Sequence, residues 1–132
     1  VYRTALISNH DVRVDEFIVD MTEAYQWADL IICRAGALTV AEVAAAGVAA
    51  VFVPFPSAVD DHQTLNAGWL ADNEAAIIVP QSELEQGNFT QPISQLLENR
   101  SRLQMMAQKA KAMAITDATV KVAAICQDLA AE

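Results

Sequence analysis

The sequence predicts an α/β fold, a Rossmann-like parallel sheet with helices on both faces, and two observations carry this prediction. Short apolar runs without polar alternation recur along the chain, as expected for strands that are covered on both faces. Segments with helical spacing of apolar residues follow these runs, in the order of right-handed βαβ units. A length of 132 residues suits one domain that spans residues 1–132.

Four segments are expected to be strands. The first, Val12–Ile18, alternates apolar and polar residues, whereas the other three are short and almost wholly apolar. These three are Asp29–Cys33, Ala50–Val53 and Ala76–Val79. A proline follows each of the last two runs, and proline cannot donate a hydrogen bond within a central strand.

Helices are expected between and after these strands. The segments are Met21–Ala28, Leu38–Ala46, Asp60–Asp72, a short helix opened by Ser82-x-x-Glu85, Gln91–Met113 and Asp117–Ala130. Gly47 follows the second helix, where a residue with positive φ commonly ends a helix. Asp60 and Asp61 are candidate caps of the third helix. Trp27 and Trp69 fall at core-facing positions of two helices and are predicted to pack in the core.

Composition and charge exclude several classes of protein. Hydrophobic residues make up 54 % of the chain, which is too many for a disordered chain. The net charge of −9 and the lack of a basic run argue against a nucleic-acid partner. No run of about 18 apolar residues predicts a membrane span. Because the first residue is valine, we expect a fragment of a longer polypeptide.

The two cysteines predict neither a disulfide framework nor a zinc site. Cys33 and Cys126 are far apart in the sequence and belong to no Cys/His cluster. Cys33 lies in an apolar run and is expected to be a buried, reduced thiol, which favours a reducing compartment. We expect no metal and no cofactor.

Three loops are candidate ligand sites, because ligands of parallel sheets bind beyond the carboxyl ends of the strands. The first loop follows Ile18, and the other two are Arg34–Leu38 and Pro54–His62. The small residues at positions 35–37 precede a helix, whose free N–H groups and dipole suit a phosphate. A tight turn that binds nothing explains the same residues.

Polar residues in and beside these loops allow two interpretations each. Glu42 completes the pattern Thr39-x-x-Glu42 of a capping box, or its two oxygens accept hydrogen bonds from a vicinal diol such as a ribose. His62, Gln63 and Asn66 share one face of a helix and suit sugar hydroxyls. A lone histidine is nevertheless more often structural. No set of residues suggests a nucleophile with its base.

Several long motifs resemble the MurG family of bacterial glycosyltransferases. They are V-x-E-F-I-x-D-M, Y-x-W-A-D-L-I-I-C-R-A-G-A-L-T-V-A-E-V-A-A-A-G, V-P-F-P and D-D-H-Q-T-L-N-A, and the likeness runs from Val12 to the C-terminus. Family members have two Rossmann-like domains in the GT-B arrangement. The resemblance implies that this chain is the C-terminal, donor-binding half, without the N-terminal acceptor domain.

The resemblance implies a role for each matching position. The backbone of Ile18 would contact uracil, and Glu42 would bind the ribose. The diphosphate and the sugar would be bound by the amides of Ala37, Leu38 and Thr39. Val40 and Ala41 belong to the same substrate-binding turn. His62 and Gln63 would contact N-acetylglucosamine, with Asn66 nearby. Position 62 is His where some family members have Gln, and both can hydrogen-bond a hydroxyl.

The activity that the resemblance implies is an inverting transfer of N-acetylglucosamine from UDP-N-acetylglucosamine to lipid I, which forms lipid II in peptidoglycan synthesis. The acceptor and the membrane would be contacted by the absent domain, at the cytoplasmic face of the bacterial inner membrane. We expect no catalytic residue in this chain, and therefore an inactive fragment. Two alternatives remain: a GT-B transferase for another UDP-sugar or acceptor, and a non-catalytic α/β binding module.

Overall fold

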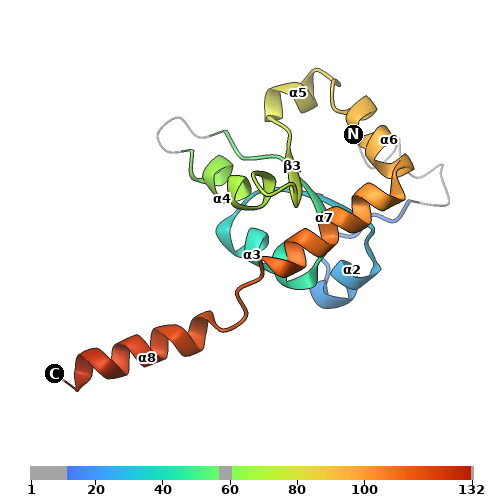
Figure 1. Cartoon of the computed structure of the whole chain (residues 1–132). Helices are drawn as coiled ribbons and strands as arrows, with labels where there is room; N and C mark the ends of the chain where they lie inside the picture. The colour runs from blue at the N-terminus through green and yellow to red at the C-terminus, as the bar shows by residue number, and fades with distance from the viewer. Residues whose placement is uncertain (1–11, 57–60, 132) are drawn as a thin grey trace.

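The computed structural model describes residues 12–56 and 61–131, which form a three-stranded parallel sheet with helices around it (Figure 1). The strands are β1 (Leu30–Cys33), β2 (Ala49–Phe52) and β3 (Ala76–Ile78), in the order β1-β2-β3. Leu30 pairs with Ala49, and Ala50 pairs with Ala76. The three apolar runs of the sequence are thus confirmed as strands.

Helices α3 (Ala37–Ala46) and α4 (His62–Ala71) connect β1 to β2 and β2 to β3. Two right-handed crossovers in the same direction put both helices on the same face of the sheet. Val43 of α3 and Leu70 of α4 accordingly share one buried cluster with Phe52 of β2. This packing fixes the first turns of both helices beside the carboxyl ends of the strands.

The opposite face of the sheet is covered by α6 (Thr90–Glu98) and α7 (Arg100–Ala112). Their side chains form a second buried cluster with alternate residues of β2; its members from these elements are Ala49, Val51, Leu96, Leu103 and Met106. All four residues of β2 are buried, which explains the absence of polar alternation in this strand. The expectation of helices on both faces is confirmed.

Helix α2 (Met21–Trp27) packs on α3, and the short α5 (Gln81–Glu85) follows β3. Helix α8 (Ala118–Ala130) projects from the rest of the molecule, and all of its residues are exposed (Figure 1). Gly47 ends α3 with a φ of 70°, as its position predicted, and its amide donates to the carbonyls of Val43 and Ala44. None of the helices in the described ranges combines the length and the apolar character that a membrane span requires.

Two predicted elements are wrong. Val12–Ile18 is not a strand: residues 12–20 are irregular, and Phe17 is 79 % exposed. Alternation alone does not make a strand, because a strand needs a partner, and none of the described strands pairs with this segment. The segment Gln91–Met113 is two helices rather than one. Asn99 separates them, and its side chain caps α7 by accepting from the Arg102 amide at 3.0 Å.

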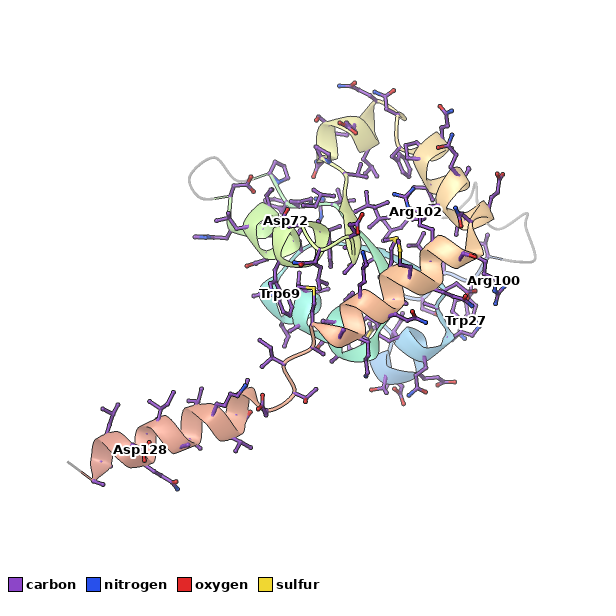
Figure 2. All side chains as sticks on the ribbon, viewed as in Figure 1. Trp27, Trp69, Asp72, Arg100, Arg102 and Asp128 are labelled. Atoms are coloured by element: carbon purple, nitrogen blue, oxygen red, sulfur yellow. The ribbon has the colours of Figure 1, made fainter. Side chains whose placement is uncertain are left out.

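Both tryptophans lie outside the core, contrary to prediction (Figure 2). Trp27 is 86 % exposed at the end of α2, and Trp69 of α4 is 38 % exposed. Helix α2 is only 7 residues long and has no buried residue, and its Tyr25, rather than Trp27, packs against a buried cluster. The short helix after β3 begins at Gln81, with Pro80 rather than Ser82 as its N-cap.

Candidate functional site

The first turn of α3 lies at the carboxyl end of β1 and presents amides without helical partners. The first helical bond runs from the Val40 amide to the Gly36 carbonyl at 3.0 Å. The amides of Ala37, Leu38 and Thr39 precede it, and no side chain caps this end. Such an end carries partial positive charge and is suited to an anion.

Small residues open the approach to these amides. Ala35 is fully buried, and Gly36 has backbone angles that any residue can adopt, with φ −61° and ψ 146°. A Cβ atom added at Gly36 would meet only Thr39 Oγ1, at 3.7 Å. The backbone conformation therefore does not require this glycine, and its small size is what distinguishes the position.

The other predicted positions of this turn differ in their surroundings. Val40 is 3 % exposed, and its side chain belongs to the core, whereas Ala41 is exposed. Both line a cavity of about 270 Å³ between α3 and α4, which is also lined by Ala37, Leu65, Asn66 and Trp69. The uncapped amides thus stand at one end of a hollow between the two helices.

Side chains of α4 and of the loop after β1 join the loops at the carboxyl ends of β1 and β2. Gln63 Oε1 accepts from the amides of Ala35 at 3.2 Å and Phe55 at 2.8 Å. Asn66 Nδ2 donates to the Ala35 carbonyl at 3.1 Å. The guanidinium of Arg34 donates to the carbonyls of Val53 and Pro54, both at 3.2 Å.

This network changes the interpretation of the polar residues on α4. Both lone pairs of Gln63 Oε1 are used by backbone amides, so a ligand hydroxyl would have to accept from the Gln63 NH₂ group. Two of the three predicted sugar contacts therefore also hold the loops. His62, the third, is the exposed first residue of α4. Asp61 caps this helix as predicted, whereas Asp60 lies outside the described residues.

Replacing Gln63 with alanine should lower the free energy of unfolding by about 1–2 kcal/mol, because two backbone N–H groups lose their acceptor. The Phe55 amide is exposed and can donate to water instead, so the loss of stability should lie near the lower end of this range. Gln63→Glu keeps an oxygen at this position and should retain most of the stability. Urea denaturation of the three proteins measures the difference, and equal midpoints for Gln63→Ala and the parent would contradict the role of this network.

Arg34 is a site residue that the sequence reasoning left without a role. Its charge lies at the carboxyl end of β1, one residue from the buried Ala35, and its guanidinium carbon is 5.3 Å from the centre of the Phe55 ring. Arg34 thus ties the loop that precedes α3 to the loop after β2, through two backbone carbonyls and the Phe55 ring. A charged residue directly after an apolar strand was the available signal.

Glu42 does not form the predicted capping box. Thr39 is the third residue of α3, and Gly36 is the N-cap, so Glu42 lies one turn too far along the helix to cap it. Its Oε2 instead accepts a hydrogen bond from the Tyr25 hydroxyl at 3.0 Å. Burial, and then the hydrogen bond and charge of Glu42, raise the pKa of Tyr25 to about 12, so the phenol remains a donor at neutral pH.

Cys33, at the end of β1, was expected to be buried, and its side chain is only partly buried. Burial raises the pKa of this thiol to about 11, which keeps it protonated and unreactive near neutral pH. Ile18 lies in the irregular segment before α2, two residues from the cap residue Asp20. Among residues 12–56 and 61–131, no group of three His, Cys, Asp or Glu side chains could hold a metal ion.

Comparisons with known proteins identify the family of this chain. Residues 3–122 match the model of the glycosyltransferase family 28 C-terminal domain. An Aeromonas hydrophila protein named UDP-N-acetylglucosamine--N-acetylmuramyl-(pentapeptide) pyrophosphoryl-undecaprenol N-acetylglucosamine transferase is 59 % identical over 89 % of this chain and 32 % of its own length. A Pseudoalteromonas atlantica protein of the same name is 53 % identical over 96 % of this chain and 33 % of its own length.

A solved structure has the same fold. The crystal structure of Acinetobacter baumannii MurG matches with a TM-score of 0.83 and 55 % identity, over 88 % of this chain and 33 % of that one. The chain thus spans about a third of the length of the relatives it matches. From the family model and these relatives, we conclude that the chain belongs to the glycosyltransferase family 28 C-terminal domain family.

Proposed function

We propose that the chain is the donor-binding part of an inverting GT-B transferase that moves N-acetylglucosamine from UDP-N-acetylglucosamine to lipid I, forming lipid II. The observation that carries the proposal is the uncapped first turn of α3, with a carboxylate one turn further along the same helix. The amides bind the diphosphate and Glu42 binds the ribose. The printed names of the relatives support this donor and acceptor.

In this mechanism the chain binds and orients the donor and stabilises the negative charge that develops on its diphosphate. Negative charge grows on the diphosphate as the sugar leaves, and the free amides of Ala37, Leu38 and Thr39 stabilise that charge. Glu42 and the residues at the start of α4 hold the donor in place without transferring a proton. The acceptor and its base belong to other parts of the enzyme, which works peripherally at the cytoplasmic face of the membrane.

Gly36→Ala tests the diphosphate site. The added methyl group stands beside Thr39 Oγ1, over the first turn that the phosphate would approach. We expect the dissociation constant for UDP-N-acetylglucosamine to rise about tenfold. The free energy of unfolding should change by less than about 1 kcal/mol, because the backbone angles of Gly36 suit alanine. Calorimetric titration of the 132-residue chain gives the binding constant, and urea denaturation gives the stability.

Gly68→Ala is the matched control, because it adds the same methyl group within α4, where it meets Asp72 Oδ2 at 3.6 Å. This variant should bind the donor as the parent does. Equal affinity of Gly36→Ala and the parent would contradict the diphosphate site. Parallel titrations with UDP-glucose and UDP-galactose test the sugar, and tighter binding of either would redirect the proposal to another UDP-sugar.

A further inference from the structure

Tyr25 connects α2 to the functional face of α3. Its ring packs at the edge of the buried cluster that contains Val43 and Phe52, and its hydroxyl donates to Glu42 Oε2 at 3.0 Å. The two residues are 17 positions apart, so the bond depends on the packing of α2 against α3. Neither the capping-box interpretation nor the family resemblance gave Tyr25 a role.

The hydrogen bond restricts a side chain that would otherwise be mobile. Glu42 is exposed and has three rotatable bonds, so fixing it when a ligand binds has an entropic cost. Tyr25 has two side-chain torsions and is anchored by the core, so it supplies a donor at a fixed point. A carboxylate can accept about four hydrogen bonds. Tyr25 uses one, which leaves capacity for two ligand hydroxyls.

We infer that Tyr25 is a positioning residue for nucleotide binding, whose hydroxyl holds the Glu42 carboxylate in the orientation that accepts both hydroxyls of the donor ribose. The inference rests on the proposed function, because it gives Glu42 the ribose contact. Tyr25 itself touches no substrate atom in this account. Its effect on binding passes entirely through Glu42.

Tyr25→Phe removes the hydroxyl and keeps the ring. We expect the 132-residue variant to bind UDP about three- to tenfold more weakly, the effect of losing one orienting hydrogen bond. Binding of 2′-deoxy-UDP should change much less, because that ligand offers Glu42 one hydroxyl fewer. The ratio of the association constant for UDP to that for 2′-deoxy-UDP should therefore fall in the variant. A purely structural role for Tyr25 would weaken both ligands equally.

Glu42→Ala separates this inference from the proposed function. In the Glu42→Ala background, the Tyr25→Phe change should have no further effect on UDP affinity. If Glu42→Ala binds UDP like the parent, the ribose contact is contradicted, and the inference falls with it. If Glu42→Ala loses affinity while Tyr25→Phe keeps both the affinity and the ratio, only the inference is overturned.

A measurement on the unmutated chain covers the case in which Tyr25→Phe fails to fold. The chain has two tyrosines, Tyr2 and Tyr25, so 3-fluorotyrosine labelling gives two fluorine resonances. A Tyr2→Phe variant assigns them. Saturating UDP should shift the Tyr25 resonance, and 2′-deoxy-UDP should shift it less. A Tyr25 resonance that stays unchanged at saturating UDP would contradict the inference.

Discussion

Replacing Glu42 with alanine is expected to weaken binding of UDP-N-acetylglucosamine by about 1–3 kcal/mol, the range for hydrogen bonds to a charged partner. This corresponds to roughly a five- to 150-fold rise in the dissociation constant. The carboxylate lies on α3 one turn beyond the uncapped amides, where a nucleotide bound through its diphosphate would place the ribose. Calorimetric titration of the parent and the variant measures the change.

Two controls make the Glu42 result specific. Glu98→Ala removes the same charge from α6, on the other face of the sheet, and should leave donor affinity unchanged. Unfolding of Glu42→Ala by urea should be close to that of the parent, because Glu42 is exposed and caps no helix. Donor affinity equal to that of the parent would refute the ribose contact and leave Glu42 as a partner of Tyr25 alone.

Phe52→Ala should lower the free energy of unfolding by about 3–5 kcal/mol, the cost of a large cavity in a packed core. Phe52 is fully buried at the end of the central strand, in the cluster that joins β2 to α3 and α4. The loss is a large share of the roughly 5–15 kcal/mol that stabilises a typical domain. Donor binding should weaken as well, since Val53, the next residue, accepts from Arg34.

Phe17→Ala is the matched control for this prediction. Phe17 is 79 % exposed, so the same truncation should change the free energy of unfolding by less than about 0.5 kcal/mol. Urea midpoints measured by circular dichroism compare the three proteins. Similar midpoints for Phe52→Ala and Phe17→Ala would contradict the assignment of Phe52 to the core.

The sheet could be predicted from the sequence because helices cover both of its faces, although Ile32 of the edge strand β1 is 48 % exposed. Strands of this kind appear as apolar runs, and the observed bounds of β1, β2 and β3 differ from the predicted ones by one residue at one or both ends. Val12–Ile18 shows the limit of such patterns. Its alternation is genuine, but pairing with a neighbouring strand is a tertiary property that a local pattern does not contain.

The position of the candidate site follows from the fold class, whereas its internal contacts could not be predicted. The carboxyl ends of β1 and β2 are identified by the fold class alone. The bonds of Gln63 and Asn66 to Ala35 join residues about 30 positions apart, and they depend on how closely two loops approach. The Tyr25–Glu42 bond likewise depends on where α2 packs. Composition and spacing carry no information about such long-range bonds.

An NMR titration of the ¹⁵N-labelled chain with UDP shows whether the first turn of α3 binds the diphosphate of a nucleotide. We expect the largest shifts on the amides of Ala37, Leu38 and Thr39, with smaller ones around Glu42. This result would be contradicted if millimolar UDP left these amides unshifted, or if the largest shifts fell on α6, whose Leu96 packs in the other buried cluster.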